Sequence, residues 1–107
     1  MDELLILYTT WPDAETAEAC GRAAVEEKLA ACANLLAPMR AIYRWEGEIQ
    51  IEVETPMLLK TTSAVASRLR DFILKYSPYD VPCILVLRTD PHNCNPQYVA
   101  WANGEIF

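Results

Sequence analysis

The chain has 107 residues and a formal net charge of −6, with 52% hydrophobic and 22% charged residues. This length and composition are typical of one globular domain, which we expect to span residues 1–107, and they exclude a disordered chain. The acidic balance argues against nucleic acid or an anionic membrane surface as the main partner, because both select a concentrated basic patch.

The chain begins with a predicted strand and helix. Residues 3–10 contain the near-continuous apolar run Leu4 to Tyr8, which predicts a strand buried on both faces. Asp13 is placed to cap a helix that we expect to run to about Ala31. The inward stripe has mostly small side chains, so this helix should lie close to the sheet; it consists of Ala17, Cys20, Gly21, Ala24, Val25 and Leu29.

A long hairpin follows over residues 29–62, with its turn at Trp45-Glu46-Gly47-Glu48. If Gly47 lies at the centre of a three-residue loop, one face pairs like with like: Trp45 with Ile49, Tyr43 with Ile51 and Ala41 with Val53. The same register sets Arg44 opposite Gln50 and Arg40 opposite Glu54. One face of the hairpin would then be apolar and the other charge-matched.

The same register sets Pro38 opposite Pro56, and neither proline can donate a ladder hydrogen bond. The pair therefore predicts a bulge or bend that divides the hairpin into a base, residues 32–36 and 57–60, and a projecting arm. The apolar face of the arm needs a cover, which a partner subunit would supply. The residues expected in this contact are Tyr43, Trp45, Ile49, Ile51 and Val53.

The second half of the chain predicts a helix, a strand and a short terminal helix. Thr62 or Ser63 would cap a helix that ends at Pro78, with the inward stripe Val65, Leu69, Phe72, Ile73 and Tyr76. Residues 81–89 form a second apolar strand, and Asn95-Pro96 begins the terminal helix. The order β-α-β-β-α-β plus a short helix predicts an α+β domain of the split βαβ type, with its first and third strands central.

Membrane and disulfide features are not indicated. No apolar run approaches the roughly 20 residues of a membrane span, and Leu4 to Leu7 is too short for a signal-peptide core. We therefore expect a cytoplasmic protein with no membrane partner. The four cysteines, at positions 20, 32, 83 and 94, include no closely spaced pair, which favours reduced and mostly buried thiols over a zinc site or disulfides.

Five blocks of the sequence, in order and at compatible spacings, extend over essentially the whole chain: Leu29–Asn34, Ile42–Ile49, Leu59–Thr62, Ser77–Pro82 and Asn95–Trp101. Together they resemble the CutA family, the divalent-cation-tolerance proteins. The resemblance implies a ferredoxin-like fold and a tight homotrimer formed through the long hairpins. It also implies a non-enzymatic function in the response or tolerance to divalent metal ions.

The chain departs from this family in one informative respect. Family members for which copper binding has been proposed carry Cys at the end of the first strand and His just before the Pro-Tyr block. This chain has Thr9 at the first place and Tyr76 with Ser77 at the second. Because hydroxyls are poor substitutes for thiolate and imidazole as copper ligands, a family-type copper site is not expected and no cofactor is required.

Two other places offer weaker metal ligands for copper or zinc. The loop 90–94 brings His92, the only histidine, within two residues of Cys94, although such a loop is more often a polar turn. The arm carries glutamates at positions 46, 48, 52 and 54. These carboxylates would either hold a hard divalent ion weakly or form a solvated face partnered by Arg40 and Arg44.

A cleft between subunits is the candidate site for a small molecule, with Asn34, Lys60, Tyr79 and Trp101 marked by the resemblance. Lys60 ends a core strand, where a lysine is seldom buried without a partner, although its head group could simply reach water. The second functional reading is therefore a sensor of the PII type, a trimer that binds ligands in such clefts. No catalytic triad order, phosphate loop or H-E-x-x-H motif is present, so we do not expect an enzyme.

Overall fold

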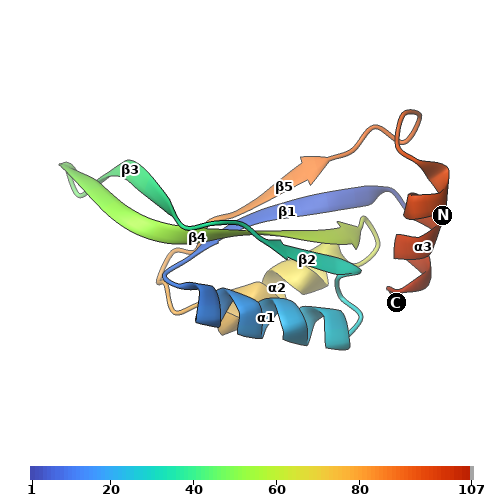
Figure 1. Cartoon of the computed structure of the whole chain (residues 1–107), viewed down its shortest axis with the longest axis horizontal. Coiled ribbons are helices and arrows are strands. Elements are labelled where there is room, and N and C mark those ends of the chain that lie inside the picture. The colour runs from blue at the N-terminus through green and yellow to red at the C-terminus, as the bar shows by residue number, and fades with distance from the viewer. Residues whose placement is uncertain (107) are drawn as a thin grey trace.

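The computed structural model describes residues 1–106 and forms a mixed α+β fold (Figure 1). Its elements are β1 (Leu4–Trp11), α1 (Ala14–Glu26), β2 (Cys32–Leu35), β3 (Met39–Trp45), β4 (Glu48–Thr62), α2 (Ala66–Tyr76), β5 (Ile84–Arg88) and α3 (Pro96–Gly104). All strand pairs are antiparallel, in the order β2-β4-β1-β5, while β3 pairs with the outer part of β4. The predicted split βαβ arrangement is confirmed, with β1 and β4 central and β5 at an edge. Within residues 1–106, no helix combines the length and the apolar character that crossing a membrane would need.

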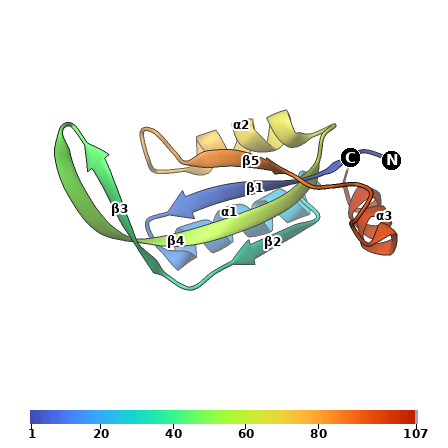
Figure 2. The same ribbon diagram turned by 90° about the horizontal axis from the view of Figure 1, so that it is seen from above.

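Helices α1 and α2 cover one face of the sheet, and α3 lies at the end of the molecule away from the arm (Figures 1 and 2). The main core lies between this face and the two helices, and includes Leu7, Trp11, Met57, Leu59, Ala17, Cys20, Ala24, Leu69 and Ile73. On the opposite face of β1, Ile6 and Tyr8 are only half-buried. The expectation that this strand is buried on both faces is therefore wrong for its open side, because helices cover one face only.

Helix α1 begins as predicted, since the Asp13 carboxylate accepts a hydrogen bond from the backbone N–H of Thr16 at 2.7 Å. Its end near Ala31 is wrong, because the helix stops at Glu26. Lys28 takes a left-handed conformation, with φ of 59°, and the backbone N–H of Leu29 donates to the carbonyl of Ala24 at 3.0 Å. This is a Schellman ending built without glycine, and it returns the chain to the sheet.

The close approach of α1 to the sheet is confirmed at Gly21. A Cβ atom at this position would lie 2.9 Å from Met57 Sδ and 3.0 Å from Ala33 Cβ, both on the sheet. Any larger side chain would push the helix away from β2 and β4. Glycine is therefore favoured here by packing rather than by an unusual backbone angle.

The other two helices begin differently from each other. Helix α3 is capped as predicted, because the Asn95 side chain accepts a hydrogen bond from the backbone N–H of Gln97 at 3.0 Å. Helix α2 has no side-chain cap, so the prediction of a Thr62 or Ser63 cap is wrong. Thr62 is the last residue of β4, and Ser63 lies in the turn that follows it. Most of the predicted α2 stripe is buried, but Tyr76 is 42% exposed.

The division of the hairpin into base and arm is confirmed. Strand β2 pairs with the inner part of β4 as far as Leu35 opposite Met57, and β3 resumes the pairing with Met39 opposite Glu54. Three residues on one strand thus face two on the other, which makes a bulge. The two prolines do not pair, however, since Pro38 lies between β2 and β3, and on that side the carbonyl of Pro56 accepts from the backbone N–H of Leu36.

The register of the arm differs from the predicted one by a single residue. Glu46 and Gly47 both have positive φ, 50° and 81°, which makes a two-residue hairpin turn and sets Trp45 opposite Glu48. Every cross-strand partner therefore changes, and so does the composition of each face. The acidic aromatic face consists of Met39, Ala41, Tyr43, Trp45, Glu48, Gln50, Glu52 and Glu54, and the basic apolar face of Arg40, Ile42, Arg44, Ile49, Ile51 and Val53.

Candidate functional site

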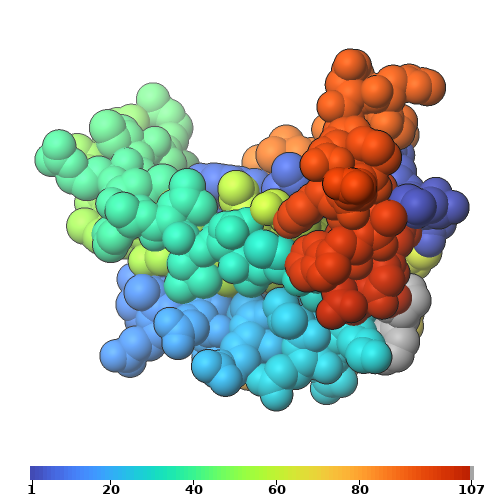
Figure 3. Space-filling model, turned by 45° about the vertical axis from the view of Figure 1, so that its right-hand side comes forward, coloured from blue at the N-terminus to red at the C-terminus, as the bar shows by residue number. Residues whose placement is uncertain are grey.

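The arm projects beyond the helices (Figures 1 and 3). Of the residues predicted to form a subunit contact, Tyr43 is 37% exposed, Trp45 50%, Ile49 58%, Ile51 62% and Val53 63%. The corrected register separates Tyr43 and Trp45 from the other three, so the five do not share one face. Ile42, at 70% exposure, joins the basic apolar face. A two-residue turn at Glu46-Gly47, had it been assumed from the sequence, would have placed Ile42 on this face.

Two phenol groups contact glutamates of the acidic aromatic face of the arm. The hydroxyl of Tyr79 donates to Glu54 Oε1 at 3.1 Å. Burial, together with this carboxylate, raises the pKa of Tyr79 well above its ordinary value. Desolvation and the charge of Glu52 raise the pKa of Tyr43 in the same way. Both phenols therefore stay protonated and act as hydrogen-bond donors to the acidic aromatic face.

A second cluster lies on the open face of the sheet beside α3. The Lys60 ammonium donates to the hydroxyl of Tyr98 at 3.2 Å and lies 5.3 Å from the centre of its ring. The rings of Tyr98 and Trp101 are 5.5 Å apart. Asn34 is on the same face, since Cys32 lies directly opposite Lys60 and Asn34 is two residues further along β2.

The four predicted cleft residues do not meet within one subunit. Asn34, Lys60 and Trp101 lie at the α3 end of the sheet, whereas Tyr79 contacts Glu54, six residues along β4 from Lys60 and therefore about 20 Å away. A shared cleft between subunits stays a prediction. Sequence reasoning missed Tyr98, the direct partner of Lys60, although its spacing of three from Trp101 on one helix was a usable signal.

Thr9, at the end of the first strand, has a structural role. Its hydroxyl donates to the carbonyl of Met57 at 2.8 Å and accepts from Trp11 Nε1 at 2.8 Å, and the residue is 1% exposed. The Ser77 hydroxyl accepts from the backbone N–H of Tyr79 at 3.2 Å. The hydroxyls of Thr9 and Ser77 are thus engaged in hydrogen bonds within the fold.

The loop with His92 and Cys94 is organised by Asp90. The Asp90 carboxylate accepts from the backbone N–H of His92 at 3.0 Å and from Asn93 Nδ2 at 2.7 Å, and these bonds lower the pKa of Asp90. Its oxygens therefore support the turn. Throughout the described part of the chain, no group of three His, Cys, Asp or Glu side chains is arranged to hold a metal ion.

The four cysteines are free thiols, as predicted. Only Cys20 is buried, and burial raises the pKa of its thiol to about 12, which removes it as a nucleophile at neutral pH. Cys32, Cys83 and Cys94 are half-buried, so the expectation of mostly buried thiols is wrong for these three. They lie at an edge strand, before β5 and in a loop, where less of the core covers them.

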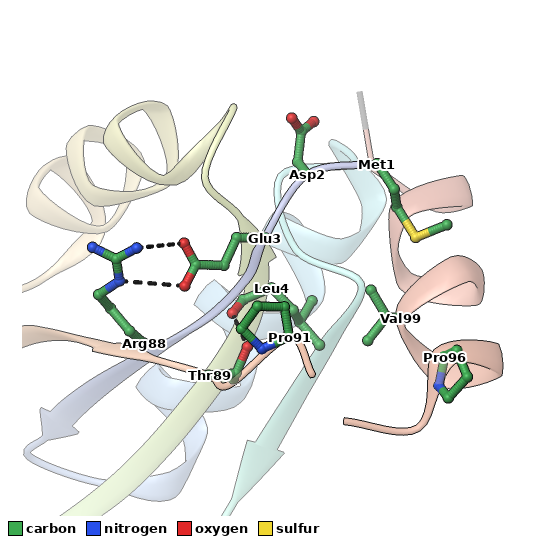
Figure 4. A pocket seen from close by; sticks show the side chains of 9 residues that line it. All are labelled: Met1, Asp2, Glu3, Leu4, Arg88, Thr89, Pro91, Pro96 and Val99. Atoms are coloured by element: carbon green, nitrogen blue, oxygen red, sulfur yellow. Dashed lines mark hydrogen bonds and ion pairs between the residues drawn. The ribbon is translucent and has the colours of Figure 1, made fainter. Parts of the chain in front are cut away.

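A hollow of about 500 Å³ lies between the N-terminus, the end of β5 and α3 (Figure 4). Its apolar lining includes Leu4, Pro91 and Val99, and on one side Arg88 Nη2 lies 2.8 Å from Glu3 Oε1 in an ion pair. None of the predicted site residues lines this hollow. It is therefore separate from both the arm and the Lys60 cluster.

Comparison with known proteins gives one consistent family. The model described as "CutA1 divalent ion tolerance protein" matches residues 5–105. The divalent-cation tolerance protein CutA of Pyrococcus horikoshii is 41% identical over 98 residues, 92% of this chain and 93% of that protein. The crystal structure of CutA from Xylella fastidiosa is similar with a TM-score of 0.93 at 30% identity, covering 98% of this chain and 99% of that one. CutA1 from Ehrlichia chaffeensis gives 0.89 at 35% identity, covering 98% and 96%. The chain belongs to the CutA1 divalent ion tolerance family.

Proposed function

We propose that this protein acts in tolerance to divalent cations as a homotrimer joined through its arms, and that it does so without catalysing a reaction. The names of its relatives support the connection with divalent cations. The observation that carries the proposed assembly is the arm, whose two faces expose six large hydrophobic side chains: Ile42, Tyr43, Trp45, Ile49, Ile51 and Val53. A surface of this kind on a stable protein favours a subunit contact.

Sedimentation velocity at micromolar concentration tests the assembly. We expect a single species with three times the chain mass of 12.1 kDa. A stable, folded monomer at this concentration would contradict the trimer. The cytoplasmic location stays a prediction, and detection of the protein in the separated fractions of its cells would check it.

Metal binding by this chain is proposed to be weak and to depend on the loop of His92 and Cys94. Because Asp90 already supports the turn, these two ligands are not joined by a preorganised third group. Calorimetric titration with copper and zinc should therefore show weak binding that His92→Ala with Cys94→Ala largely removes. Tight, stoichiometric binding that survives this double substitution would instead indicate a site built from the half-buried Cys32 or Cys83 across subunits.

A second candidate function is the sensing of a small molecule. The Lys60 cluster favours it, since an ammonium on an aromatic pair at the open face of the sheet would suit an anionic group attached to a flat ring. Titration of the trimer with a panel of nucleotides and small metabolites tests this reading. Saturable binding that Lys60→Met abolishes, with copper binding unchanged, would favour the sensor over the metal response.

A further inference from the structure

The hollow between the N-terminus, the end of β5 and α3 brings together three separate parts of the chain (Figure 4). Its volume is about 500 Å³, which lies within the roughly 300–1,000 Å³ of small-molecule sites. Its apolar lining comes from Met1, Leu4, Pro91, Pro96 and Val99. The hollow therefore has the size and the lining of a ligand site.

The N-terminal wall of the hollow is fixed by hydrogen bonds. Asn103 of α3 holds both backbone groups of Asp2, since its Nδ2 donates to the Asp2 carbonyl at 3.1 Å and its Oδ1 accepts from the Asp2 N–H at 3.1 Å. The same Nδ2 donates to the carbonyl of Val99 at 3.0 Å. The backbone N–H of Ser63 donates to the carbonyl of Glu3 at 2.9 Å. A wall that is already held in place costs a ligand little ordering free energy.

The charged side chains around the hollow are directed away from its apolar lining. Arg88 donates to the carboxylate of Glu3 from two nitrogens, at 2.8 and 3.3 Å, so these two groups are engaged with each other. The Arg88 guanidinium and the Asp2 carboxylate both point away from Val99 (Figure 4). A charged ligand against Val99 would lose water without facing an opposite charge, which is costly. The lining therefore favours an uncharged ligand.

The polar groups next to the apolar lining are also engaged. The Thr89 hydroxyl donates to the carbonyl of Leu4. The backbone N–H of Gln97 donates to the side chain that caps α3. Pro91 and Pro96 have no backbone N–H to offer. A ligand rich in hydrogen-bond acceptors would leave them unpaired here, whereas an apolar ligand would not.

The floor of the hollow is part of a packed core. Leu4 and Val99 belong to the smaller of the two core clusters, together with Ala31, Val65, Ala102 and Ile106. A molecule seated on Leu4 and Val99 would extend this core and remove apolar surface from water. A cavity of about 150 Å³ holds benzene, so the hollow has room for two fused rings.

We propose that this hollow binds a small, uncharged apolar molecule of about the size of two fused aromatic rings. The site goes beyond the proposed role in cation tolerance and depends neither on that role nor on the trimer. Met1 is 86% exposed and lies at the rim, where its flexible thioether side chain can pack over a ligand.

Fluorine NMR of 1-fluoronaphthalene, titrated with the full chain in its native assembly, measures this binding. The charged analogue 4-fluoro-1-naphthoate tests the class of ligand. Val99→Phe fills the hollow, and Val81→Phe is the matched control, because it makes the same change at a valine that is 72% exposed and does not line the hollow. Methyl NMR spectra of the wild type locate the bound probe, and circular dichroism checks the folding of each variant.

We expect saturable binding of 1-fluoronaphthalene with a Kd of about 1 mM or below, and shifts of the methyl signals of Leu4 and Val99. Val99→Phe should weaken the binding at least about tenfold, and Val81→Phe should match the wild type. Binding without saturation, or methyl shifts confined to Ile51 and Val53 of the arm, would overturn the site even if Val99→Phe does not fold. Equally tight binding of the naphthoate at Leu4 and Val99 would overturn the ligand class.

Discussion

Two buried threonines in the same sheet should respond in opposite ways to the same substitution. Thr9 and Thr62 are each 1% exposed. The hydroxyl of Thr9 donates to the carbonyl of Met57 and accepts from Trp11 Nε1. The hydroxyl of Thr62 is buried and has no hydrogen-bond partner among residues 1–106. Valine has nearly the same shape as threonine, so a Thr→Val change tests the hydroxyl with little effect on packing.

The expected magnitudes follow from these bonds. Thr9→Val removes two buried hydrogen bonds and leaves the indole N–H of Trp11 unpaired at a site that is 1% exposed. An orphaned buried donor costs about 1–3 kcal/mol, and the added methyl group returns only part of this. We expect the free energy of unfolding to fall by about 2 kcal/mol. Thr62→Val removes a hydroxyl that is already unpaired and should raise it by about 1 kcal/mol.

Urea unfolding followed by circular dichroism measures both changes. All variants must be compared at one protein concentration, because the stability of an oligomer depends on it. Thr9→Ser, which keeps the hydroxyl, should be closer to the wild type than Thr9→Val. Equal shifts of the unfolding midpoint in the same direction for Thr9→Val and Thr62→Val would refute the hydrogen-bond argument.

Three further predictions concern the helices and the arm. Gly21→Ala should lower the free energy of unfolding by about 1 kcal/mol, because overpacking against Met57 outweighs the gain in helix propensity. Gly104→Ala, whose Cβ meets open space, should raise the free energy of unfolding by up to about 1 kcal/mol. Destabilisation of both variants in urea would contradict this. Trp45→Ala should weaken assembly and folding together, by about 3–5 kcal/mol if the indole is buried in the subunit contact. An unchanged melting point and an unchanged trimer would place the indole outside the subunit contact. Hydrogen bonds from the N-terminal backbone of α1 lower the pKa of Asp13 below its ordinary value of 3.8, so its capping contribution is complete above that pH and is lost as the pH falls through the lowered value. Asp13→Asn should reduce this acid-side loss in a titration of the melting temperature, and an identical acid limb would count against the cap.

Local chemistry made much of the fold predictable. Asp13 and Asn95 cap their helices because a short side chain with a free oxygen satisfies the first backbone N–H groups wherever the helix later packs. The small stripe around Gly21 predicted a close helix for a similar reason, since side-chain size is a property of the residue itself. The end of α1 was less predictable, because Lys28 adopts the left-handed conformation usually left to glycine.

The candidate sites were only partly predictable. The sequence indicated Lys60 as a notable charge and the arm as an uncovered surface, and both features are present. Its partner Tyr98 comes from an element 38 residues later, and that contact depends on where α3 lies against the open face of the sheet. The Thr9 hydroxyl is similar: its residue type argued against copper, but its bonds to Met57 and Trp11 follow from the meeting of β1 with β4.

The sequence by itself determined the order of elements, the family, and the existence of an arm with a bulge at its root. These follow from residue type and periodicity, which act over a few positions. The tertiary structure alone decided the register of the arm, because a two-residue turn with positive φ at Glu46 is a choice between near-equal local geometries. That choice changes which residues of β4 share a face with each residue of β3. It separates Arg40 and Arg44 from the glutamates that sequence reasoning had assigned to them.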